Sequence, residues 1–284
     1  MRKEIAYIVV LKRKNKGLVI AGSFLISVSL FSGGYFVYDY TSQTKGRNDN
    51  VALADKVANG IKNYPPVNFE DRSTNGSGQG SSGDRQLTQG IDFDYLKSVN
   101  NNATRWIYLP GTNLNQVVMQ EPNVGEYFYE RHSMYGGYRL EGELFTPAIP
   151  EGSTTGQLLV FGHYMHAVYG DYMFAKLQTW YRNPETANKY KYIYVYEKGK
   201  AYRYRVYSAK ATVETDTVYS VPRPLGTSLY QEYVDKLKTE ADWTVGEAPD
   251  VNTPTLVLST CNGPINSEFR YYVSFVLDEV YDNV

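Results

Sequence analysis

Residues 255–261 read Thr-Leu-Val-Leu-Ser-Thr-Cys, and Asn262, Gly263 and Pro264 follow them. Apolar and β-branched residues over this length are typical of a buried strand, and the Gly and Pro residues after it are typical of a loop. We therefore expect a strand that ends at Cys261, with the thiol at the rim of a sheet. Cys261 is the one cysteine among 284 residues, so no intrachain disulfide can form.

Other segments of the chain have the same β character. Tyrosine is unusually frequent, at 28 residues, and aromatic and β-branched residues favour strands. Amphipathic stretches predict helices at 91–99, at 171–181 with Asp171 as N-cap, and at 228–238 with Ser228 and Gln231 as a capping box. Many short strands with few helices predict a closed or nearly closed β-barrel. The further strands that we predict are residues 116–120, 158–161, 190–196, 202–213 and 269–280.

The charge balance excludes one class of function. The chain has 29 Lys and Arg residues against 30 Asp and Glu residues, which gives a formal net charge of −1. This balance argues against a nucleic-acid binder whose affinity rests on an overall basic surface. The apolar share of 42 % is large enough to bury a core, so the chain is not disordered throughout.

The N-terminal forty residues differ from the rest in charge. They contain six basic residues against two acidic ones, and residues 17–38 are 22 residues without a charge. A helix of that length reaches roughly 33 Å, enough to cross a bilayer. We predict a cytoplasmic basic tail at 1–16 and a transmembrane anchor at 17–38, with the following residues on the outer face of the plasma membrane. The alternative is a cleaved signal peptide, but the apolar run exceeds a usual signal core and no clear cleavage site follows it.

Residues 39–85 are predicted to connect the anchor to the main domain. An amphipathic helix begins there, with Asp49 and Asn50 as possible caps. Residues 73–83 read STNGSGQGSSG, which is typical of a flexible linker. We expect the compact main domain to span 86–284.

A lone thiol is either a buried apolar group or a nucleophile, and a nucleophile needs a basic partner. The chain has three histidines, and His163 follows the predicted strand at 158–161, so it too lies at a strand end. Two strand ends on one rim of a barrel can bring His163 and Cys261 together. Arg270 lies nine residues after Cys261 on the next predicted strand, where it can stabilise an oxyanion or, alternatively, face solvent.

The other two histidines have simpler interpretations. His132 is expected at the surface or rim, and His166 in an exposed loop. A zinc site of His163, His166 and Cys261 is conceivable, but the spacing fits no metal motif. We predict no metal and no organic cofactor.

Several motifs together resemble the sortase family of membrane-anchored cysteine transpeptidases of Gram-positive bacteria. Residues 255–261 with Arg270 resemble the Thr-Leu-x-Thr-Cys…Arg signature of that family. Residues 159–163, which read Leu-Val-Phe-Gly-His, and the following 173–177 resemble the segment around its histidine, and Trp106–Thr112 is similar to an early barrel strand. The helix at 228–238 and the N-terminal helical extension resemble class B.

The resemblance implies a mainly β fold, a closed sortase-like barrel of about eight strands with peripheral helices, preceded by a transmembrane helix. It also implies that Cys261 attacks the Thr carbonyl of a C-terminal sorting signal on secreted surface proteins or pilins. His163 then protonates the departing amine and Arg270 holds the substrate or the oxyanion, while Ser259 and Thr260 either contact substrate or only pack. The acceptor is an amine of a peptidoglycan cross-bridge or of a pilin lysine.

Two other functions stay open from the residues alone. A surface cysteine protease would use the same three groups with water as the acceptor. An anchored β-barrel adhesin would carry Cys261 as an inert buried thiol.

Overall fold

The computed structural model describes residues 32–58, 90–164, 172–262 and 267–282, except positions 39 and 43. The chain divides into two compact units, Met1–Lys45 and Gly46–Val284. In the first unit the described residues are helical, and in the second a helical segment runs over residues 46–57.

Two predicted segments lie largely outside this description. Of the predicted anchor at 17–38, only residues 32–38 are described, and they are helical. No helix among the described residues has the length and apolarity needed to span a membrane. The predicted linker at 73–83 lies entirely outside the described residues. The predicted domain boundary at residue 86 stays a prediction, although the compact unit itself begins at Gly46.

Nine strands are found in the described residues. They are β1 (Ala103–Tyr108), β2 (Asn115–Gln120), β3 (Leu144–Thr146), β4 (Gln157–Phe161), β5 (Tyr192–Glu197), β6 (Lys200–Val213), β7 (Trp243–Thr244), β8 (Thr255–Cys261) and β9 (Phe269–Asp282).

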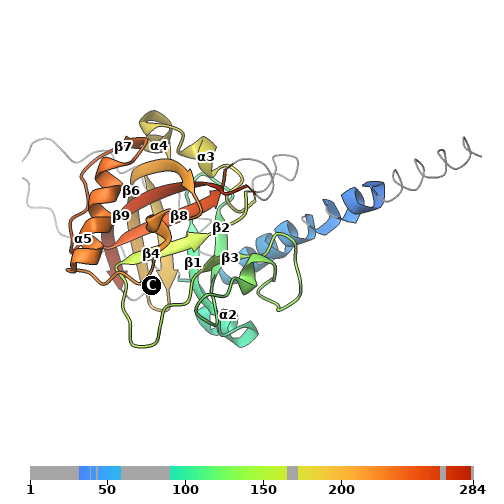
Figure 1. Ribbon diagram of the computed structural model, residues 1–284. Coiled ribbons are helices and arrows are strands. Elements are labelled where there is room, and N and C mark those ends of the chain that lie inside the picture. Colours follow the sequence, from blue (N-terminus) through green and yellow to red (C-terminus); the bar gives the residue numbers. More distant parts are fainter. Residues whose placement is uncertain are drawn as a thin grey trace, which may run out of the picture. The chain divides into compact units, whose positions relative to one another are not determined.

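These strands form one sheet in the order β5-β1-β2-β3-β4-β8-β9-β6-β7. Since β5 also pairs with β6, eight of the described strands close into a barrel and β7 extends from β6 outside the ring (Figure 1). The predicted closed barrel is therefore confirmed. The five predicted strands other than residues 255–261 correspond to β2, β4, β5, β6 and β9.

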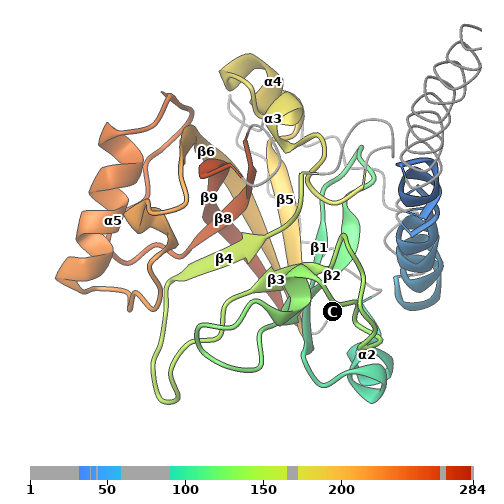
Figure 2. The same cartoon turned by 45° about the vertical axis from the view of Figure 1, so that its right-hand side comes forward.

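Helices flank the barrel at different sides. They are α2 (Phe93–Val99), α3 (Leu177–Trp180), α4 (Pro184–Lys189) and α5 (Ser228–Thr239), with short 3₁₀ helices η2 (Phe128–Glu130) and η4 (Thr217–Tyr219). In Figure 2, α3 and α4 lie at one end of the barrel, α2 lies at the other end, and α5 covers one side.

The helix predicted from Asp171 is much shorter than expected. Met173 has a left-handed backbone with φ 50° and forms an isolated bridge with Tyr164, so the helix starts only at Leu177. This bridge explains the difference, because pairing with Tyr164 takes the backbone of Met173 out of helical geometry. Asp171 itself is outside the described residues.

The predicted helix caps are also wrong in detail. At α5, Thr227 rather than Ser228 is the N-cap, because its side chain accepts a hydrogen bond from the amide of Tyr230. Residues 44–57 are one continuous helical run, so Asp49 and Asn50 lie within it and cap nothing. Their side chains instead contact the barrel domain, as described below.

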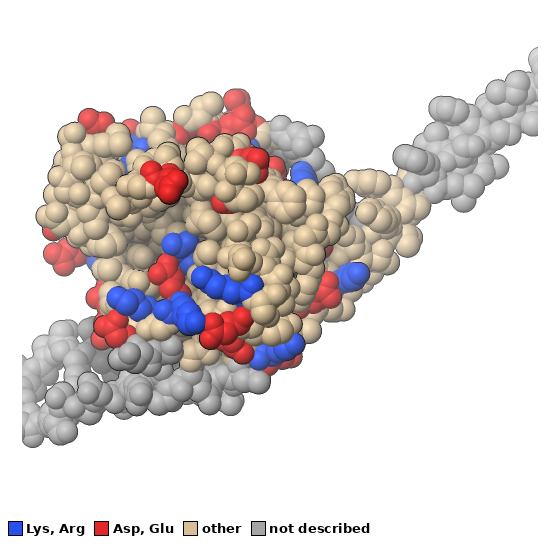
Figure 3. Space-filling view, turned by 90° about the horizontal axis from the view of Figure 1, so that it is seen from below, with Lys and Arg blue, Asp and Glu red and all other residues tan. Residues whose placement is uncertain are grey.

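Three apolar clusters hold the second unit together. The interior of the barrel is filled by alternate residues of the strands, such as Ile107, Val160 and Leu258. A second cluster lies beneath α5, and a third joins the helical segment 46–57 to α2. On the face drawn in Figure 3, basic and acidic side chains lie beside one another instead of forming a patch of one sign, as the near-zero net charge predicts.

Candidate active site

Strand pairing brings the predicted site residues to one rim of the barrel. β4 and β8 are parallel, with Phe161 opposite Ser259, so the chain leaves both strands at the same end. His163 is the second residue after β4, and Cys261 is the last residue of β8. β9 returns antiparallel to β8 and places Arg270 opposite Cys261.

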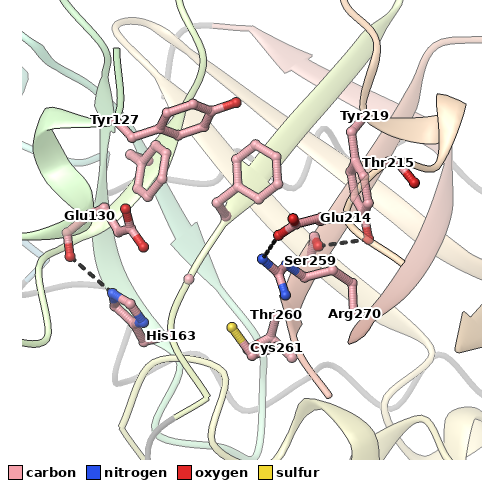
Figure 4. Close-up of a pocket in the computed structure, with 13 residues that line it drawn as sticks. Tyr127, Glu130, His163, Glu214, Thr215, Tyr219, Ser259, Thr260, Cys261 and Arg270 are labelled. Carbon is pink, nitrogen blue, oxygen red and sulfur yellow. Dashed lines mark hydrogen bonds and ion pairs between the residues drawn. The ribbon is translucent and has the colours of Figure 1, made fainter. Parts of the chain in front are cut away.

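A cleft of about 550 Å³ opens at this rim (Figure 4). All five predicted site residues line it. Residues that the sequence analysis did not single out line it too. The full lining is Tyr127, Glu130, Phe145, Phe161, Gly162, His163, Glu214, Thr215, Tyr219, Ser259, Thr260, Cys261 and Arg270.

The imidazole of His163 is oriented by a main-chain carbonyl. Its Nε2 lies 2.9 Å from the carbonyl oxygen of Glu130. Because a carbonyl only accepts hydrogen bonds, Nε2 carries the proton, and in the neutral ring Nδ1 keeps its lone pair. Nδ1 is on the side of the ring that faces the sulfur of Cys261 (Figure 4). A neutral His163 is thus arranged to take a proton from the direction of the thiol.

The surroundings of His163 favour this neutral form. Burial lowers the pKa of His163 below its ordinary 6.5, and the positive charges of Arg131 and Arg270 lower it further. The hydrogen bond to the Glu130 carbonyl opposes these effects on the pKa without cancelling them.

The guanidinium of Arg270 is held from two sides. Its Nη2 lies 2.6 Å from Oε2 of Glu214, and its Nη1 donates to the carbonyl oxygens of Ser267 and Phe269 at 2.6 and 3.0 Å. Within the described part of the chain, its Nε–H donates to no protein acceptor. Arg270 is therefore fixed in place while it retains donor capacity toward the cleft.

The residues before Cys261 differ in their surroundings. Ser259 donates from its hydroxyl to the phenolic oxygen of Tyr219 at 3.1 Å. The hydroxyl of Thr260 is buried and finds no hydrogen-bond partner among the described residues. The main-chain carbonyl of Cys261 accepts a hydrogen bond of 3.1 Å from the side chain of Gln178 on α3. α3 therefore supports the end of β8 from outside the cleft.

Aromatic rings form one wall of the cleft. Tyr127 packs edge-on against Phe145 and Phe161, with ring centroids 6.1 and 6.3 Å apart, and Phe161 contacts Tyr219 at 5.7 Å. Tyr127 is 56 % exposed, so this wall opens to solvent. Such a surface suits the apolar side chains of an extended peptide.

The sequence signals for these further residues are weak. Glu130 acts through a main-chain atom, which leaves no trace in the side-chain pattern, and Glu214 follows β6 in a turn that reads as an ordinary polar loop. The aromatic residues of the wall read only as strand formers. The alternation along β4, which turns Phe161 away from its buried neighbour Val160, is the one signal available for them.

The remaining histidines are not brought to the cleft among the described residues. His132 stacks on Phe128 with ring centroids 3.8 Å apart, and it lies at the surface as expected. His166 lies outside the described residues. Within the described ranges no three His, Cys, Asp or Glu side chains are grouped as a metal site would need.

The barrel and its cleft define a class of protein, a β-barrel enzyme with a single thiol beside an imidazole and a guanidinium. The sequence profile of the sortase domain matches residues 107–277, well over half of the chain. The chain belongs to the sortase family and is a cysteine transpeptidase.

Solved structures agree with this assignment at the level of the fold. A mutant form of Clostridium perfringens sortase B has 22 % identity, with 66 % of this chain and 86 % of that chain covered and a TM-score of 0.58. A Staphylococcus aureus sortase B–substrate complex has 23 % identity, covering 66 % and 84 %, with a TM-score of 0.57. Sortase B from B. anthracis in complex with AAEK1 has 19 % identity, covering 66 % and 84 %, with a TM-score of 0.54. No curated protein sequence matches the chain. The predicted membership of the sortase family is confirmed, and the fold of the chain is similar to that of sortase B structures.

Proposed function

We propose that this sortase uses Cys261, His163 and Arg270 to cleave a C-terminal sorting signal and to transfer the acyl group to an amine. One observation carries the proposal: the ends of β4, β8 and β9 bring these three side chains to one cleft of about 550 Å³. Val160, Leu258 and Tyr271, which lie on the same three strands, pack into the barrel core, so the three groups are held by rigid elements.

Acylation of Cys261 is the first half of the proposed reaction. The thiol proton passes to Nδ1 of His163, and the thiolate attacks the carbonyl carbon of the scissile peptide bond. Arg270 donates to the oxygen of the tetrahedral intermediate, which bears the developing negative charge. The C–N bond then breaks, the departing amine takes the proton from His163, and a thioester to Cys261 remains.

Transfer to the acceptor reverses these roles. An amine attacks the thioester carbon and gives up a proton to His163, the C–S bond breaks to release the thiolate, and His163 returns the proton to the sulfur to regenerate the thiol. One similar structure is described as sortase B complexed with triglycine, at 22 % identity and a TM-score of 0.57. That complex supports an N-terminal glycine of a peptidoglycan cross-bridge as the acceptor here, over a pilin lysine.

The partners and location follow from the same proposal. The donors would be secreted surface proteins that carry the sorting signal, bound along the aromatic wall formed by Tyr127, Phe145, Phe161 and Tyr219. Residues 17–38 would anchor the enzyme in the plasma membrane, with the N-terminus in the cytoplasm and the cleft outside. Ser259 and Thr260 would help to shape the substrate site from β8.

The test is mass spectrometry of the full-length chain with a library of sorting-type pentapeptides and two amines, triglycine and a lysine-containing peptide. We expect an acyl adduct on Cys261 that disappears when triglycine is added, with a new ligated product. Cys261→Ala should abolish the adduct and His163→Gln should slow its formation, both without loss of the fold by circular dichroism. Adduct formation in the Cys261→Ala variant would contradict the proposal.

The reaction product also distinguishes a transpeptidase from a cysteine protease. A cysteine protease with the same three groups would release hydrolysed peptide at the same rate with or without triglycine. Ligation that increases with triglycine concentration identifies the transferase.

A further inference from the structure

Asn50 is a buried polar residue that the proposed reaction does not use. It lies in the helical segment 46–57 and is 5 % exposed. Its Nδ2 donates to the hydroxyl of Tyr172 and lies 3.5 Å from Oε2 of Glu143. A buried amide with two partners far away in sequence joins the elements that carry those partners.

Glu143 belongs to a buried cluster of charges. Its Oε1 lies 2.6 Å from Nη1 of Arg139, whose Nε lies 3.3 Å from Glu141, and both glutamate side chains are fully buried. Asp49, on the same helical segment as Asn50, lies 3.5 Å from Arg139. The neighbouring carboxylates raise the pKa of Arg139, so the guanidinium stays charged. Removing one member of such a cluster leaves the others buried without compensation.

The segment with Glu143 packs directly against the backbone that orients His163. The amide of Glu143 donates to the carbonyl of Tyr129 at 2.9 Å. The amide of Arg139 donates to the carbonyl of Arg131 at 2.8 Å. At Gly142, where φ is +55°, an added Cβ would collide with the main-chain oxygens of Tyr129 and Glu130. The carbonyl of Glu130, which accepts from His163, is thus held in place by residues 139–143.

The other partner of Asn50 reaches His163 from the opposite direction. Tyr172 precedes Met173, which forms a β-bridge with Tyr164, and Tyr164 follows His163 in the chain. Tyr172 is 4 % exposed. Asn50 is therefore bonded to Glu143, whose segment packs against the carbonyl that accepts from His163, and to Tyr172, whose neighbour Met173 pairs with the residue after His163.

We propose that Asn50 and Glu143 are positioning residues for His163, and that through them the helical segment 46–57 keeps the ring in the tautomer with the proton on Nε2. The proposal rests on the catalytic role of His163 proposed above. In this proposal the helical segment 46–57, which precedes the barrel in the chain, contributes to the reaction through the contacts of Asn50.

The charged and titratable groups that face His163 come from three segments. They are Glu130 at the end of η2 with Arg131 after it, Arg270 from β9, and the thiol of Cys261 from β8. None of them is changed by a substitution at Asn50. A change in the titration of His163 in an Asn50 variant would therefore report a moved ring or a changed hydrogen bond to Glu130.

The test compares two substitutions on the same helical segment of the full-length chain. Asn50→Leu keeps the size of the side chain and removes both polar contacts. Leu53→Ala removes apolar packing from a residue that is 3 % exposed and belongs to the apolar cluster that joins this segment to α2. Glu143→Gln is the second test variant, because it keeps the shape of the side chain and removes the charge.

The readout is ¹⁵N NMR of protein labelled at its three histidines, with the His163 signals assigned by comparison with His163→Gln. Wild-type protein should show His163 neutral, with the proton on Nε2, at neutral pH. Asn50→Leu and Glu143→Gln should show a mixture of tautomers and a pKa closer to the ordinary 6.5. We expect their kcat to fall roughly ten- to a hundredfold with little change in KM, as misplacement of a reacting group does.

Leu53→Ala should lower the melting temperature and leave the tautomer and kcat unchanged. A wild-type tautomer in Asn50→Leu, or equal effects of Asn50→Leu and Leu53→Ala on the tautomer, would overturn the positioning role. If His163→Gln keeps full transpeptidation while Asn50→Leu still shifts the tautomer, the positioning role stands and the catalytic role of His163 fails.

Discussion

The ion pair between Arg270 and Glu214 offers the sharpest test of how the cleft is built. Glu214→Gln keeps the size of the side chain and removes its charge. The paired side chains are 22 % and 54 % exposed, so water screens their attraction. Pairs exposed to this degree contribute roughly 0–1 kcal/mol to folding. We therefore expect the unfolding free energy to fall by about 1 kcal/mol or less.

We expect Glu214→Gln to lower the activity more than it lowers the stability. Two main-chain carbonyls still hold Nη1 of Arg270 in the variant, at 2.6 and 3.0 Å, so the guanidinium is loosened without being released. A loss of about tenfold in kcat/KM, equal to about 1.4 kcal/mol, is the effect that we expect. Arg270→Ala removes the donor itself and should cost about 10²- to 10³-fold, as the loss of an oxyanion-stabilising group does.

The assay is cleavage and ligation of a fluorogenic sorting peptide, read together with chemical denaturation. Asp94→Asn is the matched control, because Asp94 pairs with Lys198 at 2.5 Å on the surface, with exposures of 80 % and 64 %. It should change stability as little as Glu214→Gln and leave kcat/KM unchanged. Full activity in Glu214→Gln, or a loss as large as that of Arg270→Ala, would refute the reasoning that Glu214 positions Arg270.

Three further predictions concern pH and packing. The folded state lowers the pKa of His163 below 6.5, so the unfolded chain binds a proton first as the pH falls. The free energy of unfolding should therefore decrease below pH 6.5. Melting curves of His163→Gln should lack this part of the decrease. Leu258→Ala should cost about 2–5 kcal/mol in denaturant unfolding, because Leu258 is fully buried inside the barrel; a cost near zero would contradict the packing described. In Gly162→Ala the new methyl group would collide with Leu144 and Phe174 and displace the end of β4, which precedes His163. The acylation rate should therefore fall while the protein stays folded. An acylation rate equal to wild type would show that the end of β4 adapts freely.

The parts of the site that could be predicted are those with a local signal. β8 and β4 are apolar strands of ordinary length, so their ends, and with them Cys261 and His163, were predictable from residues near in sequence. Their common direction was not, because parallel pairing is a property of the whole barrel. Glu130 and Glu214 could not be predicted at all, since one acts through its carbonyl and the other through a loop that only the closed sheet brings to β9.

The errors have the same origin. The apolar spacing after Asp171 predicts a helix, yet pairing of Met173 with Tyr164 prevents one there. Asn50 has a residue type that often caps helices, but burial against Glu143 and Tyr172 decides its place instead. In both cases a contact distant in sequence outweighs a local preference. β7, with two residues, is too short to give a periodic signal.

The parallel pairing of β4 with β8 also has a consequence for how the enzyme matures. Gln157 pairs with Thr255, 98 residues later in the chain, and closing a loop of that length costs roughly 4 kcal/mol of chain entropy. Such long-range pairing belongs to the slow steps of folding. In a newly made chain Cys261 and His163 therefore stay apart until β8 and β9 dock onto the barrel. Refolding should regain reactivity toward sorting peptides in step with barrel closure, so a molecule with an unclosed barrel would be unable to form the acyl-enzyme.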